Sequence, residues 1–178
     1  ITPNPKISGA ARWAFLAAWA WAKHQPGGSD DTARKYVSAL YHHAPILPSG
    51  ARGATTAFVE QGQGDVLLSW ENEADLAIEK LAPGKFEVVY PSSSILAEPP
   101  VAVVDKNVDR HGTRKVADAY LKFLYTKPAQ RLEAKYHYRP RDPDVRAEFA
   151  KAFPQLNLYP IDGEFAGGAR PQAKFFAD

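Results

Sequence analysis

The stretch ARGATTAFVEQGQGDVLLSWENEADLAIEKL, residues 51–81, carries the clearest fold signal in this chain of 178 residues. Its first part, 51–61, predicts a helix, which the glycines at 62 and 64 then interrupt. The apolar run VLLSW at 66–70 predicts a short buried strand, and 72–81 predicts another helix because its apolar residues recur at helical spacing. Helix, strand and helix in succession indicate an α/β fold.

The same alternation continues on both sides of this stretch. The elements expected there are, in chain order, helices over 11–23 and 30–42, strands over 86–90 and 101–104, and helices near 113–125, after 128 and near 143–153. The tryptophans at 13, 19 and 21 are expected in the core. From Pro154 onward the sequence is rich in Gly and Pro, so we expect an irregular wrap over the surface.

A change of pattern near residues 95–100 predicts a domain boundary. Alternating helices and strands precede it, and a helix-rich tail follows it. The sequence Glu98-Pro99-Pro100 lies at this point, and consecutive prolines make a stiff, extended crossover. We therefore expect one domain over 1–97 and a second contribution over 98–178.

Composition excludes several functional classes. Lys and Arg number 22 against 20 Asp and Glu, and a net charge of +2 lacks the polybasic character of nucleic-acid binders. The chain has no cysteine, which excludes a thiolate nucleophile and a Cys-based zinc site. The most apolar stretch, 13–22, is only about half as long as a bilayer span. The chain starts at Ile1 and has no methionine, so we expect a fragment whose N-terminal part, with any export signal, lies elsewhere.

A short motif occurs twice, each time immediately before an expected helix: SGAAR at 8–12 and SGARG at 49–53. The N-terminus of a helix exposes unpaired backbone N–H groups and about half a positive charge, so it attracts anions. Serine can cap the helix or donate its hydroxyl to a ligand, and glycine allows close approach to the backbone. Two such termini directed at one point would bind a tetrahedral oxyanion.

Two alternatives remain open for these motifs. Serine is a common helix cap, so Ser8 and Ser49 are consistent with ordinary caps. Trp70 ends the expected strand, at the edge where α/β sheets bind ligands, and its indole N–H is an uncharged donor; a buried core tryptophan is the alternative. No Walker-type spacing occurs, so a nucleotide-hydrolysing site is not supported.

Several blocks of sequence, in the same order, are distinctive of one family. They are NPKISGAARW at 4–13, SGARGATT at 49–56, GDVLLSWENE at 64–73, SILAEPPVAVVD at 94–105, YRPRDP at 138–143 and FFAD at 175–178. Together they resemble the periplasmic sulfate-binding proteins of ABC importers. The resemblance implies a two-lobe fold of the type II periplasmic binding protein kind, here incomplete, with a helix-rich C-terminal tail. In that fold 1–97 would form most of the second lobe, and 98–178 would contribute to the first lobe.

The resemblance also implies a set of ligands for sulfate. They are the Ser8 hydroxyl, the backbone N–H groups of Gly9, Ala10 and Ala51, and the indole N–H of Trp70. Several relatives have Gly-Gly where this chain has Gly9-Ala10, a change that keeps the donor but adds a methyl group beside the anion. Arg12 and Arg52 lie next to these donors and would stabilise the site from behind them, although exposed helix charges are the alternative.

The function implied is that of a solute receptor, not an enzyme, which passes sulfate to the membrane permease of an ABC importer in the periplasm. A site with donors only favours sulfate, because monohydrogen phosphate must also donate one hydrogen bond; thiosulfate remains open. No catalytic residue, metal or cofactor is expected. Two alternatives stay open: an oxyanion-processing enzyme for phosphoryl or sulfuryl transfer, and a fragment that cannot bind without the missing N-terminal segment.

Overall fold

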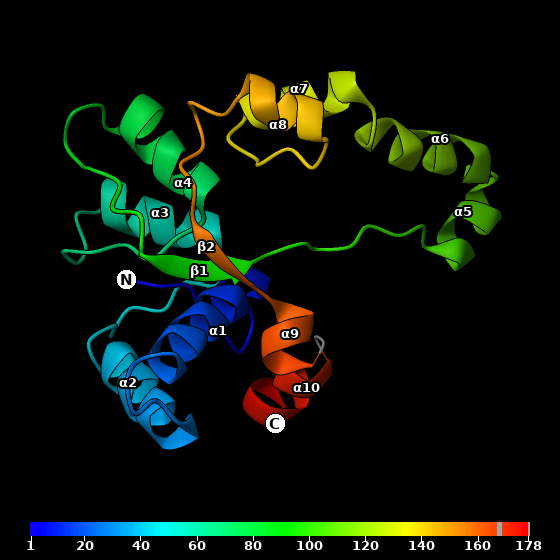
Figure 1. The fold of residues 1–178 in the computed structure, drawn as a ribbon. Coiled ribbons are helices and arrows are strands. Elements are labelled where there is room, and N and C mark those ends of the chain that lie inside the picture. Colours follow the sequence, from blue (N-terminus) through cyan, green and yellow to red (C-terminus); the bar gives the residue numbers. More distant parts are fainter. Residues whose placement is uncertain (167–168, 178) are drawn as a thin grey trace. The chain divides into compact units, whose positions relative to one another are not determined.

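A computed structural model describes residues 1–166 and 169–177 of the chain (Figure 1). Its contacts divide the chain into two compact units. The larger unit comprises Ile1–Ala97 and Leu156–Asp178, and the smaller unit comprises Glu98–Gln155. Each unit is described by itself. Within the described residues no helix has the length and apolar character needed to cross a membrane.

The larger unit contains most of the helices and both strands. Its elements are α1 (Gly9–Lys23), α2 (Asp30–His42), α3 (Ala51–Val59), α4 (Glu71–Leu76), the π-helical turn η1 (Ala77–Leu81), β1 (Ser93–Leu96), β2 (Asn157–Pro160), α9 (Ile161–Phe165), α10 (Ala169–Pro171) and the π-helical turn η2 (Gln172–Phe176). The expected helices over 11–23, 30–42 and 51–61 are confirmed to within two residues at each end. The helix expected over 72–81 is confirmed as α4 followed directly by η1.

Helix α1 is the centre of the larger unit's core. It packs against α2 and β1 (Figure 1), and it supplies Trp19 to one apolar cluster and Leu16 to the other. Trp19 lies 4.5 Å from Phe175, measured between ring centroids, and Phe175 contacts both clusters. Trp19 is buried as expected, whereas Trp13 and Trp21 are partly buried at the edges of these clusters.

The C-terminal segment differs from the surface wrap that its Gly and Pro content predicts. Instead, β2 pairs in parallel with β1, with Ser93 opposite Asn157 and Leu96 opposite Pro160. The following turns bring Phe176 into the core, where it is only 6% exposed. Apolar burial against α1 therefore overrides the local turn signals. As a result, 98–178 does not form one contact unit, because its last part packs with 1–97.

The strands expected over 66–70, 86–90 and 101–104 are not formed in the structure. A strand needs a neighbour for its backbone hydrogen bonds, and these segments have little pairing among the described residues. The exception is at 66–68, where the Ile1 amino group donates to Val66 O at 2.6 Å and Leu68 N donates to Ile1 O at 2.9 Å. Val89 and Val104 remain 77% and 61% exposed, so these apolar segments lack the cover that strand formation would bring.

The smaller unit is helical. It consists of α5 (Asp105–His111), α6 (Arg114–Leu124), α7 (Lys127–Lys135) and α8 (Pro143–Glu148). The helices expected near 113–125 and after 128 are confirmed, the one expected near 143–153 ends earlier, and α5 was not expected. Its buried residues include Val145 and Gln130; the Gln130 amide accepts from Arg141 N at 2.6 Å and donates to Leu124 O at 2.9 Å.

Candidate functional site

The first Ser-Gly-Ala motif forms the N-terminus of α1. Ser8 is the N-cap in extended conformation, is only 6% exposed, and its Oγ accepts from Ala11 N at 3.4 Å. The hydroxyl proton of Ser8 remains available, because a capping hydroxyl accepts from the helix. Within the described residues no acceptor binds the N–H of Gly9 or of Ala10. A β-carbon built on Gly9 would meet no other described atom within 4 Å, so the space beside Gly9 is open.

The second motif forms the N-terminus of α3 in a different register. Here Gly50 is the N-cap, with no side-chain hydrogen bond to the first turn, and Ala51 is the first helical residue. Ser49 therefore lies outside the helix and does not cap it. In the part of the chain that the structure describes, the Ala51 N–H also has no acceptor.

Trp70 lies at the start of α4 and not at the end of a strand. It is the N-cap residue of that helix, in extended conformation, and it is half-buried. Among residues 1–166 and 169–177 its indole N–H has no acceptor. The neighbouring Ser69 Oγ is buried without a hydrogen-bond partner in the same residues, so this position carries two polar groups that can still take part in hydrogen bonds.

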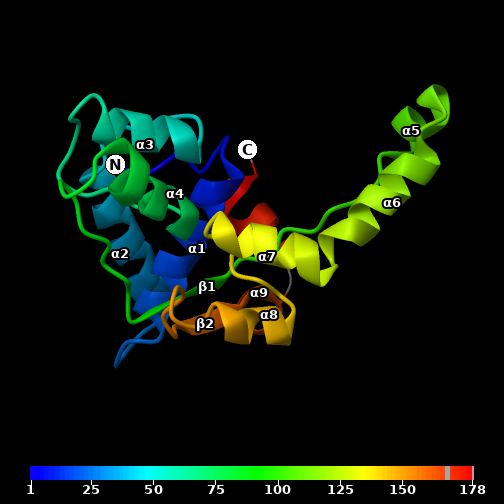
Figure 2. The same ribbon diagram turned by 90° about the horizontal axis from the view of Figure 1, so that it is seen from above.

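Backbone contacts connect the segments that carry these donors. Asn4 N donates to Pro48 O at 2.8 Å, which joins the loop before α1 to the loop before α3. Asn4 O in turn accepts from Ser8 N at 2.9 Å. Helix α3 lies beside α4, as both views show (Figure 1, Figure 2). The candidate donors thus belong to one unit and to adjoining segments of it; their role as anion ligands remains a prediction.

Arg52 and Glu73 connect α3 to α4 through hydrogen-bonded side chains. Arg52 Nε and Nη2 each lie 2.8 Å from a carboxylate oxygen of Glu73, a two-point pairing. Thr55 Oγ1 lies 3.0 Å from Glu73 Oε2 and 3.2 Å from Ala51 O. The Arg52 hydrogen bond is the main reason that the pKa of Glu73 lies below its usual value. Sequence reasoning identified Arg52 but missed the roles of Glu73 and Thr55.

Arg12, at the end of the first motif, makes three hydrogen bonds within the larger unit. Its Nε donates to Pro5 O and its Nη2 to Lys6 O, both at 3.0 Å, so it holds the loop that leads into α1. Its Nη1 donates to the Gln172 side chain at 2.9 Å. The C-terminal turn η2 therefore supports the loop before Ser8, a contact that nothing in the sequence indicated.

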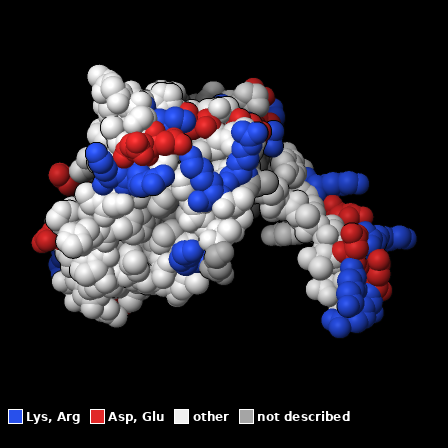
Figure 3. All heavy atoms as spheres, turned by 90° about the horizontal axis from the view of Figure 1, so that it is seen from below, with Lys and Arg blue, Asp and Glu red and all other residues white. Residues whose placement is uncertain are grey.

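The charges of the first turns distinguish α1 and α3 from α2 and α4. Acidic residues in the first turn of a helix are stabilising, because they balance the positive end of the dipole. Helix α2 has Asp30 and Asp31 there, and α4 has Glu71 and Glu73, whereas α1 and α3 have none. On the face drawn in Figure 3 positive and negative side chains are interspersed. Among the described residues, helices α1 and α3 share this lack of a first-turn acid with α6 and α7 of the smaller unit, but of these only α1 and α3 carry the Ser-Gly-Ala motif.

The histidines and carboxylates of the chain do not gather into a metal site in the described residues. No group of three or more His, Asp or Glu side chains that could hold a metal ion occurs in 1–166 and 169–177. The neighbouring rings of His42 and His43 meet edge to face, with centroids 5.7 Å apart. Hydrogen-bond donation to an anion remains the prediction for this arrangement.

The buried Glu73 carboxylate makes stability depend on pH. The pKa of Glu73 is lowered in the folded chain from its ordinary value of 4.5. In the pH range between the lowered pKa and the ordinary one, the unfolded state therefore binds more protons than the folded state. Stability from Glu73 is present above the ordinary pKa and is lost as the pH falls through the lowered one. We expect Glu73→Gln to lower the free energy of unfolding by about 1–2 kcal/mol near neutral pH. The variant should also lose less stability than the wild type as the pH falls. Urea unfolding at about pH 7, 5 and 3 measures both effects.

A matched control is Glu148→Gln, because Glu148 forms the same two-point pairing with Arg131, at 2.7 Å for each contact, but on the surface. Exposed ion pairs contribute little to stability. An acid-dependent loss that is the same in the wild type and in Glu73→Gln would contradict this account.

Comparison with known proteins shows that the chain is similar to solute-binding proteins. Residues 1–139 match the model of a family described as bacterial extracellular solute-binding protein. The sulfate-binding protein of Escherichia coli (strain K12) is 53% identical over 178 residues, which are 100% of this chain and 54% of that protein. The thiosulfate-binding protein of Pseudomonas aeruginosa is 42% identical over 178 residues, which are 100% of this chain and 53% of that protein.

A solved structure supports the fold. The sulfate-binding protein SubI from Mycobacterium tuberculosis H37Rv matches with a TM-score of 0.86 and 37% identity, over 99% of this chain and 59% of that one. The expected fold class, an incomplete α/β fold of the periplasmic binding protein kind, is confirmed. The chain spans about half the length of the curated relatives that it matches. Because the family model matches most of its length, the chain belongs to the bacterial extracellular solute-binding protein family.

Proposed function

We propose that the chain is the larger part of a receptor that binds sulfate through neutral hydrogen-bond donors and delivers it to an ABC importer. The ligands proposed are the Ser8 hydroxyl, the N–H groups of Gly9, Ala10 and Ala51, and the Trp70 indole. The names of the relatives support sulfate and thiosulfate as ligands, and they support a binding protein over an enzyme.

One observation carries the proposal: α1 and α3 both begin without an acidic residue in the first turn, and their leading N–H groups have no acceptor among the described residues. An anion would satisfy these donors and the two positive helix ends together. Arg12 and Arg52 follow the donors by one or two residues in sequence and make hydrogen bonds within the unit. The donors themselves are uncharged.

Donors without acceptors favour a fully ionised anion. Sulfate carries no proton near neutral pH, so every one of its oxygens accepts hydrogen bonds. Monohydrogen phosphate carries a proton that would be left unpaired, which costs about 1–3 kcal/mol when it is buried. Thiosulfate, the ligand named for the Pseudomonas aeruginosa relative, meets the same requirement and is the second candidate.

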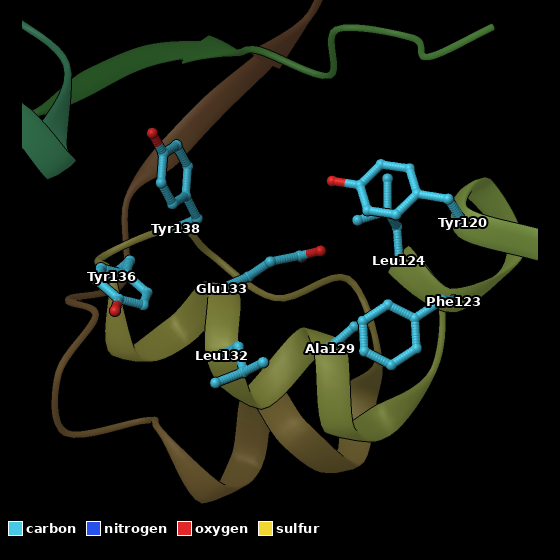
Figure 4. Close-up of a pocket in the computed structure, with 8 residues that line it drawn as sticks. All are labelled: Tyr120, Phe123, Leu124, Ala129, Leu132, Glu133, Tyr136 and Tyr138. Atoms are coloured by element: carbon cyan, nitrogen blue, oxygen red, sulfur yellow. The ribbon is translucent and has the colours of Figure 1, made fainter. Parts of the chain in front are cut away.

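The larger unit would form most of the second, anion-binding lobe, and the smaller unit would contribute to the first lobe. The smaller unit supports this assignment, because its apolar side chains lack cover. A pocket on α6 and α7 is lined by Tyr120, Phe123 and Leu132, among others (Figure 4). Val116, also on α6, is 71% exposed. We propose that the missing N-terminal segment, within the half of the relatives' length that this chain does not span, covers this surface and completes the site.

The compartment and the partner follow from the same proposal. A receptor of an ABC importer acts in the periplasm and docks on the membrane permease. No nucleic-acid partner is proposed, since the net charge is only +2.

Thermal unfolding of the full-length protein tests the proposal. A ligand that binds only the folded state stabilises it, by about 2.7 kcal/mol at one hundred times the dissociation constant. We expect the Tm to rise with sulfate, and with thiosulfate if that is also a ligand, but not with phosphate at equal ionic strength. A phosphate response equal to the sulfate response would refute the donor-only site, and no response to any of the three would refute the receptor.

A further inference from the structure

The Arg52–Glu73 pair connects two residues that are close in sequence to two of the proposed sulfate donors. Arg52 directly follows Ala51, and Glu73 lies three positions after Trp70. The pair is a two-point contact, with 2.8 Å from Arg52 Nε to Glu73 Oε2 and 2.8 Å from Nη2 to Oε1. A planar fork of this kind restrains both distance and orientation, which a single contact does not.

The carboxylate is the fixed member of this pair. The Glu73 side chain is only 8% exposed, whereas the Arg52 side chain is 64% exposed. Thr55, which is fully buried, adds a third contact to Glu73 and lies within hydrogen-bond distance of Ala51 O. Glu73 therefore contacts α3 at two residues, Arg52 and Thr55, and it does so from the first turn of α4.

We propose that Glu73 is a positioning residue for anion binding, which sets the separation between the Ala51 N–H and the Trp70 indole N–H through Arg52 and Thr55. The proposal rests on the sulfate-binding function proposed above and adds to it the residue that determines donor spacing. Glu73 does not touch the anion. Its charge is neutralised by Arg52, so the carboxylate lies near the site without repelling a dianion.

The donors on α1 depend on other contacts. The loop that leads into Ser8 is held by Arg12, through Pro5 O and Lys6 O. The hydrogen bonds that hold the loop before Gly9 and Ala10 thus do not include Glu73. A change at Glu73 should affect Ala51 and Trp70 and spare Gly9 and Ala10, whereas a general loss of stability would affect all four.

Two substitutions in the full-length protein test this inference. Glu73→Gln keeps the shape of the side chain and removes its charge, and Arg52→Lys keeps the charge and removes the fork. We expect each to weaken sulfate binding about tenfold in isothermal titration, by analogy with metal sites, where changing a residue that orients a ligand costs about 10- to 100-fold in affinity. The matched control is Arg131→Lys, because Arg131 makes the same fork with Glu148 in the smaller unit. That variant should bind sulfate like the wild type.

Nuclear magnetic resonance supplies a readout that a merely structural role would not give. In the wild type, sulfate should move the amide proton signals of Gly9, Ala10 and Ala51 and the indole proton signal of Trp70 downfield. In both variants the shifts at Ala51 and Trp70 should shrink, while those at Gly9 and Ala10 persist. Unchanged affinity and shifts in the variants, or an equal loss of all four shifts, would overturn this inference alone. A wild type without any response to sulfate would overturn the proposed function, and this inference with it.

Discussion

Replacing Ala51 with proline is expected to weaken sulfate binding by the full-length protein about 10- to 100-fold while the fold is kept. Proline removes one backbone N–H, and a hydrogen bond to a charged group contributes about 1.5–3 kcal/mol. Ala51 is the first residue of α3, a position where proline is favoured. The preceding Gly50 is extended, with φ −159° and ψ 171°, which suits a residue before proline. Isothermal titration measures the loss, and thermal unfolding checks the fold.

The matched control is Ala51→Gly, which removes the methyl group and keeps the N–H. It should bind sulfate within about threefold of the wild type. Glycine in a helix lowers the free energy of unfolding by at most about 1 kcal/mol and leaves the N–H donor in place. If Ala51→Pro folds and binds sulfate as tightly as Ala51→Gly, the backbone of α3 is not a ligand.

A larger effect is expected from Ala10→Asp, which should lower sulfate affinity at least about 1000-fold. Ala10 is the second residue of α1, whose first turn has no acidic residue. A carboxylate there would take the place of the anion at the positive helix end. It would also repel a dianion, by about 4 kcal/mol per pair of charges at 4 Å near a protein surface. The same carboxylate stabilises the helix by about 0.3–1 kcal/mol, so the Tm should hold or rise.

Ala10→Asn separates charge from size, because asparagine is nearly isosteric with aspartate and neutral. It should lose far less affinity than Ala10→Asp. An equal loss of sulfate affinity in the two variants would mean that the size of the side chain, and not its charge, causes the loss. The anion would then not lie at the N-terminus of α1.

The helices were predictable because their signals are local. Apolar spacing placed α1, α2 and α6, and Ser29 caps α2 with a reciprocal bond to Thr32. Helix α5 was missed because its sequence DKNVDRH has no apolar face. Its boundaries were nevertheless marked, by Asp105 in the first turn and by Gly112 in left-handed conformation at the end.

The strands were less predictable because strand pairing depends on segments that are far apart in the sequence. The run at 66–70 has the composition of a buried strand. Among the described residues, however, the strand-like backbone hydrogen bonds of Val66 and Leu68 go to Ile1. The strands that do form, β1 and β2, join Ser93–Leu96 to Asn157–Pro160, more than sixty positions later. No local pattern indicates such a partner. The sequence therefore predicts extended segments better than it predicts which of them pair.

The candidate site divides in the same way. Ser-Gly-Ala before a helix is a local signal, and it placed Ser8 and Ala51 at helix starts. It did not show that Gly50 and not Ser49 caps α3, since the two motifs look alike in sequence. The contacts of Glu73 with Arg52 and of Arg12 with Gln172 join residues 21 and 160 positions apart, and only the fold reveals them.

The central claim is that neutral donors on α1, α3 and the start of α4 bind a fully ionised oxyanion. Isothermal titration of the dialysed full-length protein with sulfate, and then with phosphate at neutral pH, tests it most directly. The account predicts saturable one-to-one binding of sulfate and no saturable binding of phosphate. The same titration of the 178-residue chain alone shows whether it binds without the rest of the protein. Full-length protein that binds neither anion, or binds phosphate as tightly as sulfate, would contradict the account.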